Sequence, residues 1–165
     1  MFMIRKIWDH FEEYILIGSF LIIIPLVFLQ VVMRYVFQNS LTWSEELARY
    51  IFLWQIWLGA SYATKKARHI RIEIIKEKLS QNGRAVLEII VLLAWMFFAL
   101  FLTVKGFELS KGIFETQQLS PAMLMPMGYA YLSVPVGSLL MVIRLVEKFW
   151  EIITGMKRGK GAEVN

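Results

Sequence analysis

The stretch Ser40–Arg71, SLTWSEELARYIFLWQIWLGASYATKKARHIR, joins a helix start, an apolar run and a basic end in one continuous piece. Thr42 and Glu45 have the spacing of a capping box, in which a hydroxyl and a carboxylate bind backbone N–H groups of the first turn. No Asp, Glu, Lys or Arg occurs from Tyr50 to Thr64. The pattern predicts a helix over residues 42–67, which at about 1.5 Å per residue is roughly 39 Å long and can cross the roughly 30 Å hydrocarbon core of a bilayer.

The composition of the whole chain is typical of a membrane protein. The 165 residues are 58% hydrophobic and 19% charged, with a mean hydropathy of +0.56, whereas soluble domains are usually less than half apolar. The chain has no cysteine, which excludes disulfides and thiolate metal sites. Its net charge of +5 comes from basic residues that flank apolar runs, a pattern that favours contact with membrane lipids and argues against nucleic acid.

Three further apolar runs predict the other helices of an all-α membrane protein with four spans. An uncharged run over residues 14–33, closed by Arg34, predicts the first span over residues 14–34. Two further runs predict the third span over 84–111 and the fourth over 121–144. Ser120 and Pro121 form a helix-start pair for the fourth span, the cap followed by the first helical position.

The segments outside the spans are short. Residues 1–13 form an amphipathic leader that we expect at the membrane interface, and residues 155–165 form a Gly- and Lys-rich tail that we expect to be disordered. Over residues 69–82 the apolar positions fit both a period of two and a helical spacing, so periodicity leaves the local structure open. We therefore expect one membrane domain over residues 1–165, with short amphipathic segments at the interface.

The distribution of basic residues predicts that both termini are cytoplasmic. With four spans, Arg34, Arg49, Lys105 and Lys111 lie on one side, and the other fourteen of the 18 lysines and arginines lie on the side of the termini. Short loops rich in Lys and Arg stay in the cytoplasm. A basic segment after the second span is a candidate lipid anchor on that side; it contains Lys65, Lys66, Arg68, His69 and Arg71.

The contents of the apolar runs argue against several functional classes. A membrane cytochrome needs axial ligands inside its spans, yet the two histidines, His10 and His69, lie at span ends. An ion-coupled carrier needs an ionisable group within the membrane, and the middles of the first two spans have none. An enzyme needs a paired acid and base or a metal cluster, and the sequence shows no such set. No cofactor is expected either. The pattern favours a subunit that packs against a partner holding the transport site; the alternative is a small transporter or pore formed by self-association.

Two kinds of residue are candidates for functional roles. Small residues at four-residue spacing allow helices to approach closely, within the chain or at a partner interface; these are Gly59, Ala63 and Ala67, and Ser133 with Gly137. Charged and aromatic residues at the outer ends of the first two spans form either a cap with local ion pairs or a surface that organises subunits and docks a partner. These are Arg34, Trp43, Glu45, Glu46 and Arg49, with Arg49 within reach of both glutamates.

Several short motifs, in this order and at this spacing, resemble one transporter family. They are Arg34-Tyr35-Val36-Phe37, the run from Ser40 to Tyr50, Leu58-Gly59-Ala60, His69-Ile70-Arg71-Ile72-Glu73, Ser120-Pro121-Ala122, Pro126-Met127, Tyr131, Val134-Pro135-Val136-Gly137 and Arg144. Together they are similar to the DctQ-like small membrane subunit of tripartite ATP-independent periplasmic (TRAP) transporters. The resemblance covers nearly the whole chain.

The resemblance implies a three-part uptake system in the bacterial inner membrane. The small subunit would brace a separate large membrane subunit that binds substrate and sodium ions, and an extracytoplasmic binding protein would deliver the substrate. The substrates of the family are mostly organic anions. The small subunit itself would have no catalytic, cofactor or metal site.

Overall fold

The computed structural model describes residues 2–66 and 81–162, and residues 1, 67–80 and 163–165 lie outside the described part. All of its regular elements are helices, which confirms the expected all-α class. The helices are α1 (Phe2–Tyr35), α2 (Thr42–Lys66), α4 (Gln81–Glu115), the short α5 (Gly128–Tyr131) and α6 (Ser133–Ala162).

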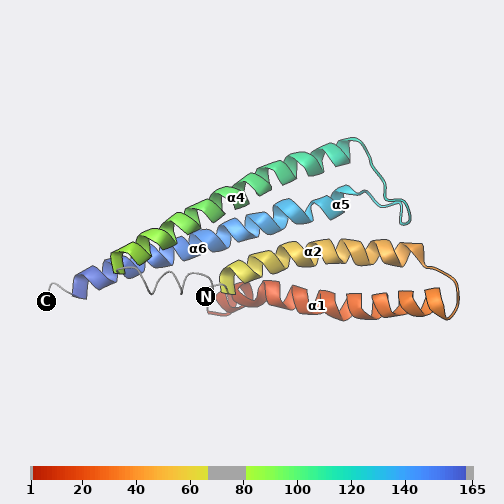
Figure 1. Cartoon of the computed structure of the whole chain (residues 1–165), viewed down its shortest axis with the longest axis horizontal. Coiled ribbons are helices and arrows are strands. Elements are labelled where there is room, and N and C mark those ends of the chain that lie inside the picture. The colour runs from red at the N-terminus through yellow and green to blue at the C-terminus, as the bar shows by residue number, and fades with distance from the viewer. Residues whose placement is uncertain (1, 67–80, 163–165) are drawn as a thin grey trace.

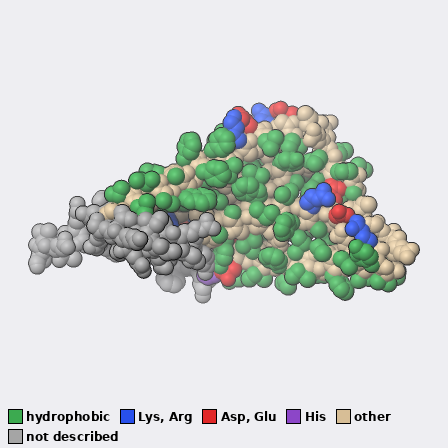
Figure 2. Space-filling view, viewed as in Figure 1, with side chains coloured by type: hydrophobic (Ala, Val, Ile, Leu, Met, Phe, Trp, Pro, Cys, Tyr) green, Lys and Arg blue, Asp and Glu red, His purple; other side chains and the backbone are tan. Residues whose placement is uncertain are grey.

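The four long helices form a single layer in the order α1, α2, α6, α4 (Figure 1). The central helix α2 packs against α1 on one side and α6 on the other, and α4 packs against α6. This arrangement leaves two broad faces and puts α1 and α4 at the edges. The edge helices are covered with exposed apolar side chains such as Leu21 and Phe97, as expected for surfaces in contact with lipid or another membrane protein. Apolar side chains are also spread over the face seen in Figure 2 wherever described residues are drawn.

The packing between α4 and α6 provides the apolar core. Leu92 and Ala99 of α4 are buried together with Met141 and Leu145 of α6. Nearer the other end of α4, Gly106 lies against α6, where a Cβ atom on it would be 2.9 Å from the Cδ atom of Pro135. The absence of a side chain at Gly106 therefore permits the two helices to approach.

Hydrogen bonds between side chains join neighbouring helices within their apolar parts. Gln55 of α2 donates from Nε2 to the Oγ atom of Ser19 of α1 at 2.9 Å. The hydroxyl groups of Thr103 in α4 and Ser138 in α6 are 3.0 Å apart. Such bonds are a common means of holding helices together in a membrane, where apolar surface alone gives little preference for protein over lipid.

Three helical segments are long and apolar enough to cross a membrane among the residues that the structure describes. They are His10–Tyr35, Val86–Glu115 and Gly128–Ile152. The helix α2 begins at Thr42, as predicted, and has 25 residues, but it is not one of the three. It carries the buried polar residues Gln55, near its centre, and Ser61, toward its C-terminal end, which lower its hydropathy.

The ends of several elements differ from the sequence expectations. The helix α1 begins at Phe2 and runs through the expected leader, so residues 2–13 belong to the first long helix and are not a separate segment. The helix α6 continues to Ala162, so residues 155–162, expected to be disordered, are helical. Most of the ambiguous segment 69–82 lies outside the described residues.

The expected helix start at Ser120 and Pro121 is wrong. These residues belong to a loop between α4 and α5 in which Leu119 and Pro126 form an antiparallel bridge. The physical reason is that Ser120 makes three contacts across the loop: its N–H donates to Met125 O, its carbonyl accepts from Leu124 N, and its hydroxyl oxygen accepts from Met125 N. Helix resumes only at Gly128.

Candidate functional site

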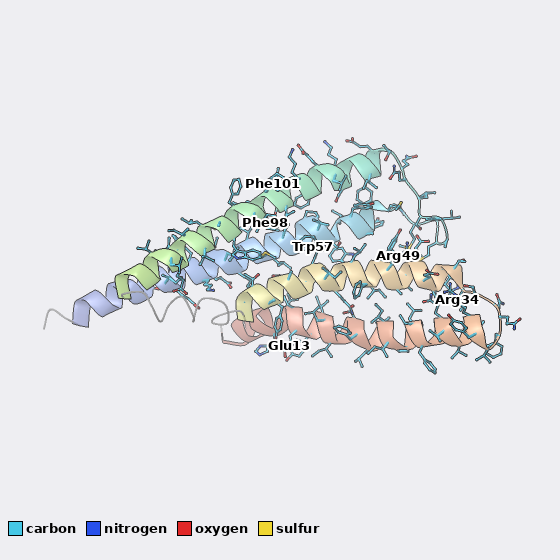
Figure 3. The ribbon with its side chains drawn as sticks, viewed as in Figure 1. Glu13, Arg34, Arg49, Trp57, Phe98 and Phe101 are labelled. Atoms are coloured by element: carbon cyan, nitrogen blue, oxygen red, sulfur yellow. The ribbon has the colours of Figure 1, made fainter. Side chains whose placement is uncertain are left out.

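Ion pairs connect the C-terminal end of α1 to the start of α2. The Nη2 atom of Arg34 lies 3.3 Å from Oε2 of Glu45, and Nη2 of Arg49 lies 3.8 Å from Oε1 of the same carboxylate. All three side chains are 45% or more exposed, and exposed pairs of this kind contribute little to stability. Arg34 and Arg49 lie toward the same end of the layer in Figure 3, and the charged atoms there form a distinct group in Figure 2. The three side chains thus form a charged surface that a partner can reach.

Glu46 does not join this cluster, although it follows Glu45 directly. Successive helical residues point about 100° apart, and Glu46 points inward, with only 7% of its surface exposed. Its Oε2 atom accepts hydrogen bonds from the backbone N–H groups of Ala122 at 2.8 Å and Met123 at 3.1 Å. The expectation that Arg49 serves both glutamates is therefore met only for Glu45, and Glu46 instead binds the loop between α4 and α5.

Trp43, the fifth residue of the predicted outer cluster, lies in the first turn of α2 and is 44% exposed. The structure thus brings Arg34, Glu45 and Arg49 together, leaves Trp43 on the nearby surface and directs Glu46 elsewhere.

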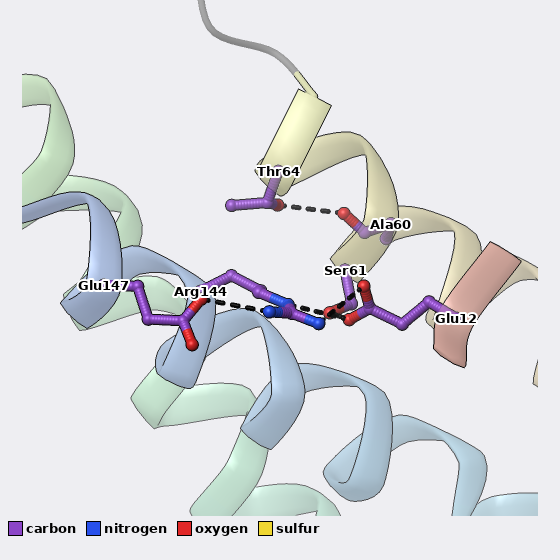
Figure 4. Close-up of polar contacts among 6 residues, drawn as sticks. All are labelled: Glu12, Ala60, Ser61, Thr64, Arg144 and Glu147. Carbon is purple, nitrogen blue, oxygen red and sulfur yellow. Dashed lines mark hydrogen bonds and ion pairs between the residues drawn. The ribbon is translucent and has the colours of Figure 1, made fainter. Parts of the chain in front are cut away.

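A second charged cluster lies at the opposite end of the layer and was not foreseen from the sequence. Arg144 of α6 donates from Nε to Oε1 of Glu12 and from Nη2 to Oε2 of Glu12, both at 3.2 Å (Figure 4). Glu12 also accepts a 2.7 Å hydrogen bond from the Oγ atom of Ser61. The Nη1 atom of Arg144 donates to Glu147 at 3.0 Å. These contacts join α1, α2 and α6, and we call Glu12, Ser61, Arg144 and Glu147 the inner clamp.

Burial distinguishes the inner clamp from the outer ion pairs. The side chains of Glu12 and Arg144 are 0% and 2% exposed. Breaking a buried pair leaves one charge without compensation, which is strongly destabilising. A signal was present in the sequence, because Glu12 and Arg144 both lie at the ends of apolar runs on the side of the termini. The two residues are 132 positions apart, and no local sequence pattern predicts a contact over such a distance.

The small residues at four-residue spacing have different surroundings on α2 and on α6. A Cβ atom on Gly137 of α6 would lie 2.5 Å from Cβ and 2.8 Å from the backbone C of Trp57, so α2 and α6 are in backbone contact there. Ser133 is buried and donates to the carbonyl of Ala130 in α5. On α2, Gly59 has only the tip of Leu16 within 4.0 Å of its Cβ position. Ala63 is exposed, and Ala67 lies outside the described residues.

The predicted lipid anchor is mostly beyond the described part of the chain. Lys65 is half-buried in the last turn of α2, which ends at Lys66. Arg68, His69 and Arg71 are among residues 67–80, outside the described ranges. Within the described ranges, no group of three or more His, Asp or Glu side chains is placed to hold a metal ion.

Sequence comparisons identify relatives over most of the chain. Residues 23–155 match the sequence profile of the DctQ component of tripartite ATP-independent periplasmic transporters. The sialic acid TRAP transporter small permease protein SiaQ of Vibrio cholerae is 27% identical, with 92% of this chain and 86% of that protein aligned. The C4-dicarboxylate small permease protein DctQ of the same organism is 24% identical, over 89% of this chain and 73% of that protein.

A longer relative shows the same similarity in part of its length. The isethionate TRAP transporter permease protein DctMQ of Oleidesulfovibrio alaskensis is 31% identical over 84% of this chain. The chain spans only 23% of the length of that protein.

Proposed function

The chain belongs to the DctQ family of TRAP transporter components, and we propose that it is the small subunit that scaffolds a separate large permease. It is a component of a transporter in the inner membrane and not an enzyme. In the proposed assembly the large permease takes up an organic acid together with sodium ions. An extracytoplasmic binding protein delivers that acid.

The observation that supports the scaffold role is that buried charged side chains bind other groups of the same chain. Glu12 and Arg144 bind each other, and Glu46 binds two backbone amides of the loop between α4 and α5. These groups hold helices and a loop in place: Glu12 and Arg144 compensate each other's charge, and Oε2 of Glu46 binds the loop while its Oε1 is buried without a hydrogen-bond partner among the described residues. Binding of a solute or a coupling ion requires charged or polar groups that can turn toward it. A layer of helices with many exposed apolar side chains is instead suited to support another membrane protein.

We further propose that α2 also crosses the membrane, giving four spans. It lies between α1 and α6, both of which contain segments able to span a bilayer. Its 25 residues correspond to about 38 Å of helix, which exceeds a hydrocarbon core of about 30 Å. With four spans, the Lys and Arg distribution puts both termini in the cytoplasm. The inner clamp then lies toward the cytoplasm and the Arg34–Glu45–Arg49 cluster toward the outside.

Three roles for the candidate residues follow from this orientation. The outer cluster of Arg34, Glu45 and Arg49, with Trp43 beside it, is placed to meet the binding protein. We propose that the basic residues that follow α2 in the sequence bind anionic lipid of the cytoplasmic leaflet. Gly59 and Ala63 have space around them and are available to a helix of the large permease, whereas Gly137 is used inside the chain.

The substrate class rests on what the relatives carry. Their names specify sialic acid, C4-dicarboxylate and isethionate, all of which are small organic acids that are anionic at neutral pH. We propose the same class for the system that contains this chain.

Co-purification tests the proposed function. A tagged copy of the chain, expressed from its own genome and extracted in mild detergent, should retain a much larger multi-span membrane protein at equimolar ratio. Recovery of homo-oligomers alone would contradict the proposal and would favour the self-associating transporter or pore.

A further inference from the structure

The loop over residues 117–127, QQLSPAMLMPM, carries no charge although it lies at the outer end of the layer, beside the start of α2 (Figure 1). Between Glu115 and Arg144 the only ionisable side chains are Tyr129 and Tyr131. The side chains of Leu119 and Leu124 are 54% and 67% exposed, and Met125 is also exposed. The outer loop thus presents apolar side chains where water-facing loops usually have polar ones.

The backbone of the outer loop is held by a closed set of hydrogen bonds. Two of its residues are prolines, and eight of the other nine donate their amide N–H to a partner within the chain. Ser120 and Met125 bind each other across the loop, Met127 donates to Gln118 O, and Glu46 accepts from Ala122 and Met123. The loop is therefore preformed, and a partner that binds it does not have to order it.

Leu124 combines two unfavourable features. Its φ angle is 53°, in the left-handed region, where a residue with a Cβ atom is strained. Its side chain is also among the more exposed leucines of the chain. Strained residues that remain well determined are concentrated at functional surfaces. An asparagine or glycine would adopt this backbone with less strain, so an apolar side chain here calls for another explanation.

We propose that the outer loop is an apolar contact for the extracytoplasmic binding protein, with Leu124 at its centre. This inference rests on the proposed function and adds a second, uncharged part to the docking surface. Glu45 and Glu46 connect the two parts, because Glu45 binds Arg34 while its neighbour Glu46 binds the loop. A small apolar centre with charged residues around it is the usual composition of a protein–protein contact.

The position of the loop favours the binding protein over the other candidates. In the proposed assembly, helices of the large permease pack alongside the long helices of this chain and meet the faces or edges of the layer. The loop closes the end of the layer, which faces the extracytoplasmic solution in the proposed orientation (Figure 1). Lipid would cover the same side chains only if the loop were immersed in the bilayer, and this is an outcome that the experiment below separates.

The test uses the assembled complex of this chain with the large permease in nanodiscs. We expect Leu124→Asn to weaken binding of the substrate-loaded binding protein about tenfold, since asparagine adopts a left-handed φ but removes the apolar contact. Leu124→Met should bind within about twofold of wild type. Wild-type affinity for Leu124→Asn would overturn the inference. Failure of the wild-type complex to bind any binding protein would instead contradict the proposed function itself.

A labelling experiment separates lipid from protein contact and does not depend on the Asn variant folding. The chain has no cysteine, so Leu124→Cys provides its only thiol for a polarity-sensitive fluorophore. We expect quenching by aqueous iodide, protection when the binding protein is added, and no quenching by spin-labelled lipid. Quenching by the labelled lipid, or no change on binding of the binding protein, would overturn the inference.

Discussion

Arg144 and Glu12 are 132 residues apart in sequence, yet the Nη2 atom of one lies 3.2 Å from the Oε2 atom of the other in a site closed to solvent. The contact joins the first and last long helices, α1 and α6, across the end of α2. In the layer, α1 packs mainly against α2, so this ion pair and its hydrogen bond to Ser61 give α1 a fixed position relative to α6.

The inner clamp should be essential for folding of the chain. Arg144→Gln leaves the buried Glu12 carboxylate without its charged partner and should lower stability by about 3–5 kcal/mol. Glu12→Gln should cost less, because Arg144 keeps its ion pair with Glu147. The loss would appear as a fall in the melting temperature of the detergent-solubilised protein. Size-exclusion chromatography after heating would measure how much folded protein remains. The exposed pair provides the control, because Arg34→Gln should change stability by less than about 1 kcal/mol.

A double variant separates pairing from general disruption of the site. Replacing both partners by apolar residues, Glu12→Leu with Arg144→Met, removes both charges and should recover most of the stability that either single change loses. If the double variant is as unstable as the sum of the two single variants, the two side chains do not act as a pair.

Glu46 should control the outer loop without affecting the rest of the layer. Glu46→Ala removes the acceptor of the Ala122 and Met123 amides, and each such charge-assisted bond is worth about 1.5–3 kcal/mol. Hydrogen exchange in peptides covering residues 117–127 should become at least about tenfold faster. The neighbouring variant Glu45→Ala is the matched control, and unchanged exchange in Glu46→Ala would show that the carboxylate does not hold the loop.

Gly137 should be intolerant of any side chain. A Cβ atom there would meet Trp57 at its Cβ and backbone atoms, so Gly137→Ala should push α2 and α6 apart and destabilise the chain by about 1–3 kcal/mol. Trimming the indole with Trp57→Ala should not rescue it, since the clash involves the backbone. Gly18→Ala is the comparison, because nothing lies within 4 Å of that Cβ position and alanine favours helix. Equal stability of the two alanine variants would contradict the close contact.

The outer charges should govern the rate at which the binding protein docks. Arg49→Ala with Glu45→Ala removes the exposed pair while leaving Glu46 and the outer loop in place. We expect insertion in the membrane to be normal, uptake in cells to fall, and the salt dependence of binding to become shallower. Wild-type uptake by this double variant would remove the docking role of the cluster.

The helices could be predicted from the sequence because each leaves a local pattern. The all-α class and the start of α2 at Thr42 follow from apolar runs, charged ends and turn residues, all of which act between near neighbours. The leader was assigned separately from the first span because its charged residues break the apolar run. Helical hydrogen bonds join backbone groups and do not depend on side-chain polarity. The helix therefore continues through the charged residues, and α1 begins at Phe2.

The contacts that hold the layer together were beyond sequence reasoning because they join distant segments. Gly106 against Pro135, Glu46 with the outer loop, and Arg144 with Glu12 depend on how whole helices pack. Ser120 and Pro121 are a valid helix-start pair locally, yet Ser120 binds Met125 and closes a loop instead. The different directions of Glu45 and Glu46 could have been deduced, since adjacent residues on a helix do not share a face.

The most direct test of the scaffold role is uptake into proteoliposomes under an inward sodium gradient. The probes are radiolabelled C4-dicarboxylates, sialic acid and isethionate, each with its binding protein outside. The chain reconstituted together with the co-purified large permease should accumulate one of these acids, and the chain alone should accumulate none. Sodium-driven accumulation of an organic acid by the chain alone would contradict the account.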